Sequence, residues 1–490
     1  MTTLIDTLDP STGEIIESVP VMTEEEVLSA TALARDAGIW WREQGFAGRR
    51  ACLLAWRRYL ARHASEIIDL LHRENGKPRP DAALELLLSL EHITWTAKNA
   101  GKILRRETRS PGLLMSNFSA HVEHLPFGVV GVLGPWNYPL YTPNGSIATA
   151  LAAGNTVVFK PSEYTPTVAR LYVDAFARAN PQAPEGILSL ITGNGDTGAH
   201  LCRAGIDKMA FTGSTATGRK VMTACAEQLV PVVLELGGKD AAIVLADADL
   251  RAAADAIAFG AMGNGGQTCV GIERVYVERN VREQFLAELT AALDGLQPGS
   301  EPDSAYGPMT MPSQIEIVRR HVTRAIDDGA RPVIGGMDSI GDRYITPIVL
   351  LDPPHHSVAI QEETFGPTVT VTTVDSPEEA VRLANDVGFG LAGSVFSRRR
   401  GTAVARMLDT GQVSINSVLG FAAIAALPLG GRGDSGFGRI HGQEGLREFT
   451  RTRSIATQRF PIPGIKLLSF RRPGWINRLL PRIIHTLHGR

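Results

Sequence analysis

The order of hydrophobic and polar residues divides the first half of this chain into two regions. From residue 23 to about residue 107 it predicts helices: Thr23 followed by Glu26 predicts a capping box, and Pro78 predicts the start of a further helix after the Asn75-Gly76 break. From 128 to 236, helical windows separate short β-rich runs, namely GVVGVLG, NTVVFK, ILSLIT, KMAFT and PVVLEL. Strands that alternate with helices predict a doubly wound parallel sheet.

A second region of strands and helices begins near DAAIVLADADL and continues to about residue 450. It contains the strand-like runs RVYVERN, TVTVTTV and AGSVFS, and a predicted helix near 281–294. Between the first helices and the first sheet lies RSPGLLMSNFSAHVEHLPF, where short stretches alternate around turn residues and predict an extended hairpin. The predicted fold class is therefore α/β.

Composition and charge exclude several classes of protein. Of the 490 residues, 44% are hydrophobic and 20% are charged, and the net charge of −2 gives no reason to expect nucleic acid as a partner. The four cysteines (Cys52, Cys202, Cys225 and Cys269) form no CxxC pair, so we expect neither a disulfide scaffold nor a metal site. The N-terminus lacks the regions of a signal peptide and no apolar run could span a membrane, so we expect a cytoplasmic protein.

Cys269 lies in GGQTCVG, where flanking glycines leave room for a substrate. Glu235, in LELGGK, ends a strand predicted to be buried, where a carboxylate is costly unless it faces a cleft or stays protonated. It is the candidate base for Cys269, 34 residues further on, because no CxH pattern supplies a histidine. Asn137, in GPWNYP, is an amide donor that could form an oxyanion hole with the Cys269 N–H. Taken singly, Glu235 could instead cap its own turn, and Asn137 could be an ordinary turn residue.

Two glycine-rich turns compete as a site for a pyrophosphate. GNGDTG matches GxGxxG at Gly193, Gly195 and Gly198, and FTGSTATG places Gly213 and Ser214 at the end of a strand. The residues alone do not rank these two turns.

FKPSE ends another strand and offers two groups to a cofactor. Lys160 could donate to a ribose hydroxyl or a phosphate, and Glu163 could accept from a ribose 2′-hydroxyl, although the two could also form a surface pair. A carboxylate at this place would repel a 2′-phosphate, which favours NAD over NADP.

Seven motifs occur in order: GPWNYP, FKPSE, FTGS, LELGGK, GQTC, EETFGP and SGFG. Together they resemble the NAD(P)-dependent aldehyde dehydrogenase superfamily over nearly the whole chain. The resemblance implies a discontinuous Rossmann-like NAD-binding domain (1–107 and 127–237), a catalytic domain (238–445), an oligomerisation arm (108–126 and 446–459) and a C-terminal tail (460–490). It also implies a homodimer or homotetramer.

In that family's pattern Cys269 is the nucleophile, Glu235 the general base and Asn137 an oxyanion donor. The resemblance places the pyrophosphate near FTGS and the adenine beside GNGDTG, so the apparent GxGxxG is not the usual fingerprint. The implied NAD-contacting residues are Trp136, Lys160, Ser162, Glu163, Gly193, Gly195, Phe211, Gly213, Ser214, Leu236, Glu363 and Phe365.

Two departures from related enzymes bear on the substrate and the proton path. Members similar to succinic semialdehyde dehydrogenases often carry an arginine six positions before the cysteine, where this chain has Gly263, and SVLGFAAIAALPLGG is strongly apolar. We therefore expect NAD-dependent oxidation of an apolar aliphatic or aromatic aldehyde to its carboxylic acid. The alternatives are a semialdehyde dehydrogenase, a CoA-acylating enzyme, which retention of Glu235 argues against, and a non-catalytic binding protein.

A second glutamate that many members carry after SGFGR is replaced by Ile440 and His441, and we expect a structural role for His441.

The C-terminal tail is basic and amphipathic. From Lys466 onward it has no acidic residue, and its apolar residues recur at helical spacing with Arg478 and Arg482 towards the other face. Such a segment could lie in a membrane interface, or it could pack on the enzyme's own surface or on a neighbouring subunit. Pro481 is expected to interrupt a long helix there.

Overall fold

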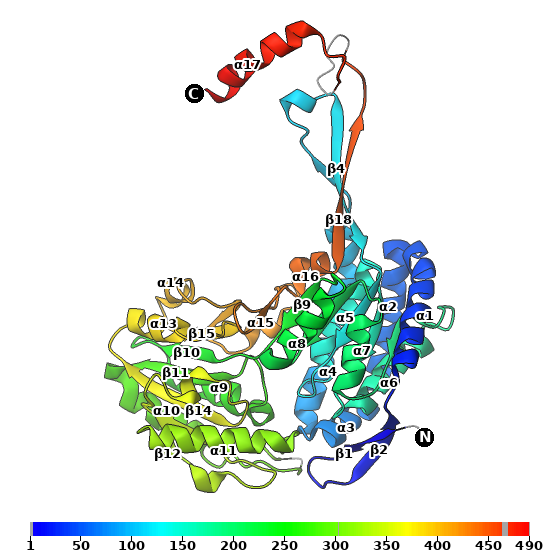
Figure 1. Ribbon diagram of the computed structural model, residues 1–490. Coiled ribbons are helices and arrows are strands. Elements are labelled where there is room, and N and C mark those ends of the chain that lie inside the picture. The colour runs from blue at the N-terminus through cyan, green and yellow to red at the C-terminus, as the bar shows by residue number, and fades with distance from the viewer. Residues whose placement is uncertain (1–2, 302, 463–468, 490) are drawn as a thin grey trace. The chain divides into compact units, whose positions relative to one another are not determined.

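The computed structural model describes residues 3–489 except 302 and 463–468. The chain forms two compact units. We call the first, Met1–Ile103 with Pro126–Thr450, the body, and the second, Leu104–Leu125 with Arg451–Arg490, the arm-tail unit. Figure 1 labels their helices and strands.

The body begins with a two-stranded hairpin and four helices, as the sequence predicts for the helices. The hairpin is β1 (Leu4–Leu8) with β2 (Ile15–Pro20), and the helices are α1 (Glu24–Glu43), α2 (Gly45–Arg62), α3 (Ala64–Asn75) and α4 (Arg79–Ile103). The capping box is confirmed: Thr23 Oγ1 accepts from the Glu26 N–H at 3.3 Å, and the Glu26 carboxylate accepts from the Thr23 N–H at 2.7 Å. Gly76, at φ +87°, ends α3, and α4 begins directly after Pro78.

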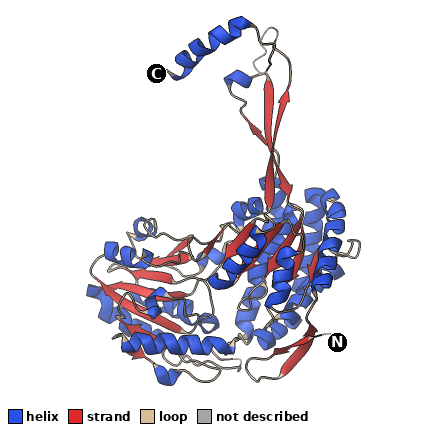
Figure 2. Ribbon diagram, in the orientation of Figure 1, coloured by secondary structure: helices blue, strands red, loops and turns tan. Residues whose placement is uncertain are grey.

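The first sheet confirms all five predicted strands. Its order is β17-β9-β8-β5-β6-β7, and every pair is parallel except β17 with β9. The strands are β5 (Val129–Leu133), β6 (Thr156–Lys160), β7 (Leu188–Leu190), β8 (Lys208–Thr212), β9 (Val232–Glu235) and β17 (Gly436–Phe437). The helices that follow these strands are α5 (Tyr141–Ala153), α6 (Pro166–Ala179), α7 (Gly195–Arg203) and α8 (Thr215–Ala226), and Figure 2 shows helices on both sides of the strands.

The second sheet has the order β12-β13-β14-β11-β10-β15-β16, with β12 antiparallel at one edge. Its strands are β10 (Asp240–Val244), β11 (Ile272–Glu278), β12 (Arg331–Ile334), β13 (Ile348–Leu351), β14 (Thr368–Val374), β15 (Ala392–Phe396) and β16 (Gln412–Ile415). Its helices include α9 (Leu250–Met262), α10 (Arg282–Leu293), α11 (Pro312–Asp327), α12 (Val358–Gln361), α13 (Pro377–Asn385), α14 (Gly401–Ala405), α15 (Gly420–Ala423) and α16 (Gly442–Glu448). The helix predicted near 281–294 is α10.

The arm-tail unit contains the predicted hairpin, extended by one more strand. β3 (Glu107–Arg109) pairs antiparallel with β4 (Phe118–Pro126), and β18 (Thr450–Gln458) lies on the other side of β4. The tail forms α17 (Gly474–His488). The expectation that Pro481 interrupts a long helix there is wrong, because α17 continues through it. No helix among the described residues is long and apolar enough to cross a membrane.

Candidate active site

Cys269 follows a tight backbone turn that only glycines permit. Gly265 and Gly266 have φ of +64° and +69°, and a Cβ on Gly266 would lie 2.0 Å from the Gly366 carbonyl oxygen. A Cβ on Gly238 would lie 2.2 Å from the Cys269 carbonyl oxygen. The glycines near Cys269 therefore allow three backbone segments to approach one another closely, beyond leaving space around the sulfur.

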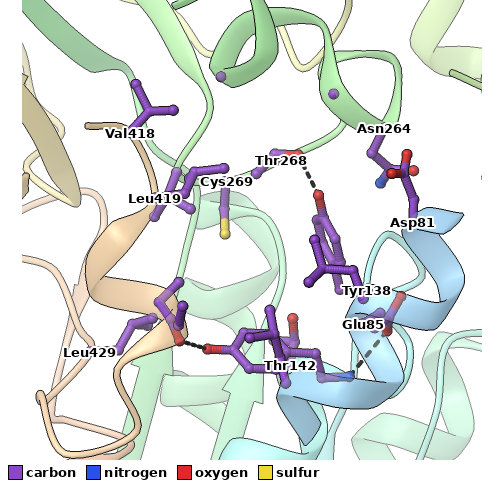
Figure 3. A pocket seen from close by; sticks show the side chains of 18 of the residues that line it. Asp81, Glu85, Tyr138, Thr142, Asn264, Thr268, Cys269, Val418, Leu419 and Leu429 are labelled. Atoms are coloured by element: carbon purple, nitrogen blue, oxygen red, sulfur yellow. Dashed lines mark hydrogen bonds between the residues drawn. The ribbon is translucent and has the colours of Figure 1, made fainter. Parts of the chain in front are cut away.

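A cavity of about 300 Å³ lies beside Cys269 in the body. Figure 3 shows the Cys269 sulfur pointing into it, with Leu419 on one side and Tyr138 on the other. Much of the wall is apolar, with contributions from Leu84, Leu88, Phe259, Val418, Leu419, Leu429 and Ile440. Among the described residues that border it, Lys77 is the single lysine or arginine. The cavity therefore offers a ligand a mainly apolar wall.

Glu235 borders the same cavity and is 4% exposed. Burial raises the pKa of its carboxyl well above the usual range, and Oε1 has no hydrogen-bond partner among the described residues. Burial, followed by the Glu363, Asp240 and Glu235 charges, also raises the pKa of the Cys269 thiol to about 12. Glu235 is therefore a carboxyl whose raised pKa suits proton exchange with a ligand in the cavity.

Asn137 lies next to this cavity but does not border it. Its Nδ2 donates to the Gln267 carbonyl oxygen at 2.9 Å, two residues before Cys269. The backbone carbonyl oxygen of Asn137 accepts from Lys77 Nζ at 2.9 Å and from Asn264 Nδ2 at 3.1 Å. One of the two amide N–H groups is thus committed to holding the loop before Cys269, and the other makes no hydrogen bond to the described residues.

The turn that carries Asn137 is supported by an enclosed ion pair between Lys77 and Glu85, which the sequence did not lead us to predict. Lys77 Nζ lies 2.5 Å from Glu85 Oε2, and neither side chain is exposed. Glu85 Oε1 accepts from the Leu140 and Tyr141 N–H groups at 2.8 and 3.1 Å. Lys77 Nζ also lies 4.1 Å from the centre of the Tyr138 ring. The sequence did carry an indication of this pair, since Glu85 interrupts an apolar run just as Glu235 does.

His441 is buried, and burial lowers the pKa of its imidazole to about 4, so the ring is neutral. It packs on His92, with ring centres 4.1 Å apart. Neither of its ring nitrogens has a hydrogen-bond partner among the described residues. Ile440 borders the cavity as an apolar residue.

Both glycine-rich turns precede helices. Ser214 caps α8, where its Oγ accepts from the Thr217 N–H at 3.3 Å, and Asn194 caps α7 in the same way. A Cβ on Gly193 would lie 2.0 Å from Thr197 Oγ1, and one on Gly213 would lie 2.6 Å from the Phe211 ring. Local packing therefore accounts for a glycine at each of these two positions.

Lys160, the last residue of β6, donates from Nζ to the Pro161 carbonyl oxygen at 2.7 Å, and burial lowers its pKa. Ser162 Oγ donates to Glu163 Oε2 at 3.4 Å. These groups lie at the carboxyl end of a central strand, where ligands bind in open α/β sheets.

The LELGGK and EETFGP motifs meet in the structure. Glu363 accepts from the Gly238 N–H at 2.9 Å, and burial raises the pKa of its carboxyl to about 8. The Phe365 ring lies edge-on to Trp136, with centres 5.6 Å apart. Leu236 lies against Gly218 of α8 and also borders the cavity beside Cys269, so it is the predicted cofactor residue that the structure places on the cavity wall.

The chain matches the family model described as "Aldehyde dehydrogenase family" over residues 1–455. It belongs to that family, and it is an aldehyde-oxidising oxidoreductase with an α/β fold.

Particular relatives are also informative. The chain is 37% identical to a 4,4'-diapolycopene aldehyde oxidase from Methylomonas sp, over 96% of this chain and 88% of that protein. It is 35% identical to a putative succinate-semialdehyde dehydrogenase [NADP(+)] from Mycolicibacterium smegmatis, over 91% of this chain and 87% of that protein. Its structure resembles lactaldehyde dehydrogenase from Escherichia coli with a TM-score of 0.88 at 30% identity, covering 94% of this chain and 96% of that one.

Proposed function

We propose that this enzyme oxidises an apolar aliphatic or aromatic aldehyde to its carboxylic acid with NAD as the acceptor. The observation that carries the substrate class is the cavity beside Cys269, whose wall is largely apolar and whose single lysine is already paired with Glu85. A substrate carboxylate would find no unpaired cation there among the described residues, whereas each buried methylene contributes about 0.8 kcal/mol to binding.

In the proposed reaction the Cys269 thiol gives its proton to solvent, and its sulfur bonds to the aldehyde carbon. Negative charge develops on the former carbonyl oxygen, which the free Asn137 amide N–H and the Cys269 backbone N–H stabilise. Bound NAD supplies the acceptor for the hydride that leaves this carbon. Glu235 then takes a proton from water, whose oxygen attacks the thioester carbon and releases the carboxylic acid and the Cys269 sulfur.

The residues near α8 and β6 fit a dinucleotide. Ser214 and the first turn of α8 are suited to a pyrophosphate, because N–H groups at a helix N-terminus bind anions. Lys160 and Glu163 carry a donor and an acceptor for ribose hydroxyls, and Glu363 beside Phe365 would hold the second ribose. The preference for NAD rests on Glu163, since its carboxylate would repel a 2′-phosphate. The name of the Mycolicibacterium relative specifies NADP. A comparison of NAD with NADP therefore tests this part of the proposal directly.

The domains, the subunit arrangement and the location are assigned from the resemblance to the aldehyde dehydrogenase superfamily. We assign NAD binding to residues 1–107 and 127–237, the catalytic domain to 238–445, and subunit association in a homodimer or homotetramer to the arm at 108–126 and 446–459. The location we propose is the cytoplasm.

The deciding experiment is an aldehyde panel scored by kcat/KM from NADH or NADPH absorbance, with and without CoA. We expect hexanal or benzaldehyde with NAD to exceed succinic semialdehyde by at least tenfold, and we expect Cys269→Ala to be inactive while it still binds NAD. Cys52→Ala, which removes a buried thiol elsewhere, is the matched control. A preference for succinic semialdehyde would favour the alternative that the Mycolicibacterium name suggests, and a requirement for CoA would favour the acylating enzyme. No turnover with any aldehyde would overturn the proposal.

A further inference from the structure

α17 presents an apolar face that the described residues of the arm-tail unit leave largely exposed. Seven apolar residues occupy one side of its helical wheel: Trp475, Ile476, Leu479, Leu480, Ile483, Ile484 and Leu487. Of these only Ile476 is buried, whereas Trp475 is 46% and Ile484 is 60% exposed. Within the arm-tail unit most of this apolar face thus stays exposed, as the contact surface for an external partner would be.

The polar side of α17 is basic. Arg478 and Arg482 flank the apolar face on the side of Trp475, and no acidic residue follows Glu448 in the chain. Pro481 falls on the polar side of the wheel, so the N–H that it lacks does not interrupt the apolar face. An apolar face bordered by tryptophan and arginine is the arrangement of helices that lie in the plane of a membrane surface.

Charge is divided very unequally between the two units. The segments 104–125 and 451–490 hold twelve lysines and arginines against two glutamates, a net charge of +10. The whole chain carries −2, so the remainder carries −12. The unit that exposes the apolar helix is therefore also the one that an anionic surface would attract.

A second apolar element lies in the same unit. Leu113 and Leu114, in the turn between β3 and β4, are exposed, and so is Phe460 after β18. Asn117 joins these two places, because its carbonyl oxygen accepts from the Arg459 N–H at 2.8 Å and its Nδ2 donates to the Phe460 carbonyl oxygen at 2.9 Å. The end of the arm thus offers further apolar side chains.

We propose that α17 docks on an anionic lipid surface, with its apolar face among the acyl chains and Arg478 and Arg482 at the level of the phosphates. Phe460, which follows the arm, adds one more apolar side chain to the contact, whereas Leu113 and Leu114 belong to the arm that we assign to subunit association. This inference goes beyond the proposed reaction and does not depend on its substrate. Its consequence for that reaction is that the enzyme would be held where apolar aldehydes partition.

Vesicle co-sedimentation of the full chain tests the proposal. Vesicles of phosphatidylcholine alone are compared with vesicles containing 30% phosphatidylglycerol, at low and high salt. We expect binding to the anionic vesicles at low salt, at least fivefold less binding at high salt, and little binding to phosphatidylcholine alone. Leu479→Asn with Ile484→Asn should lower the bound fraction at least fivefold, and Arg478→Gln with Arg482→Gln should weaken its dependence on salt.

The matched control is Asn477→Ala with His485→Ala, which changes two exposed residues outside the apolar face of the same helix and should bind like the unmodified chain. Turnover of a water-soluble aldehyde should be unchanged in all three variants, which separates this proposal from the proposed function. Absence of binding to anionic vesicles at low salt overturns the proposal, as does equal binding by the Leu479/Ile484 variant. If that variant instead forms a smaller species on size exclusion, a second copy of the chain covers the face.

Discussion

Lys77 and Glu85 form an enclosed ion pair that holds both ends of the turn carrying Asn137. Lys77 donates to the Asn137 carbonyl oxygen, while Glu85 accepts from the backbone of Leu140 and Tyr141. Among the described residues, neither partner of the pair is hydrogen-bonded to the Cys269 sulfur or to Glu235, so the role of the pair is to position the turn.

Glu85→Gln should therefore lower both stability and activity. Breaking a buried pair leaves a charge uncompensated, at a cost of about 3–5 kcal/mol in the free energy of unfolding. Urea unfolding measures this cost, and kcat should fall more than KM rises because the Asn137 amide acts on the transition state. Arg79→Gln, which breaks a half-exposed pair with Asp69, should cost less than about 1 kcal/mol. Equal effects of the two substitutions would show that the enclosed pair has no special role.

Glu235→Gln should release one NADH per active site in a burst and then stall. The amide cannot take a proton from water, so the Cys269 thioester would accumulate. Stopped-flow absorbance and intact-protein mass would detect the two products of that first turnover. A variant without a burst would show that Glu235 is also required to ionise the thiol.

The rate should rise from neutral to alkaline pH. Both Glu235 and Cys269 react in their deprotonated forms, and the pKa of each is raised, that of Cys269 to about 12. A pH profile of kcat/KM in the unmodified enzyme should thus climb above pH 7, and Glu235→Gln should change its shape. A profile that falls over this range would contradict the assigned roles.

Gly263→Arg should shift the preference towards succinic semialdehyde. Gly263 borders the cavity, and a Cβ there would meet nothing closer than the Phe259 ring at 3.8 Å, so a side chain fits. The guanidinium would supply an unpaired cation, because Lys77 in the wall is already paired with Glu85. The ratio of kcat/KM for succinic semialdehyde to kcat/KM for hexanal should therefore rise at least tenfold. Gly263→Leu adds similar bulk without charge and should not produce this shift.

Glu163→Gln should narrow the preference for NAD over NADP, since it removes the charge that opposes a 2′-phosphate. The ratio of the two kcat/KM values measures this, with the exposed Glu185→Gln as the control. An unchanged ratio would mean that Glu163 does not contact the adenosine ribose.

The sequence predicted those features that depend on local pattern. The strands β5 to β9 and the Thr23 capping box follow from periodicity and from spacing of a few residues. The burial of Glu235 was also foreseeable, because the residue stands between two leucines in a strand. Lys77 and Glu85 were not foreseen, since their partners lie about 60 residues away in a turn that only the fold brings near. The glycine positions show the same limit: a Cβ on Gly266 would collide with Gly366, a contact that no local pattern reveals.

The apolar cavity has a consequence for turnover as the reaction proceeds. The aldehyde enters without charge, but the acid leaves as an anion at neutral pH. That anion would lie against a mainly apolar wall, whose single lysine among the described residues is already neutralised by Glu85. The chamber that favours the substrate therefore disfavours its oxidised form, so product inhibition should be weak and the enzyme should keep working as acid accumulates.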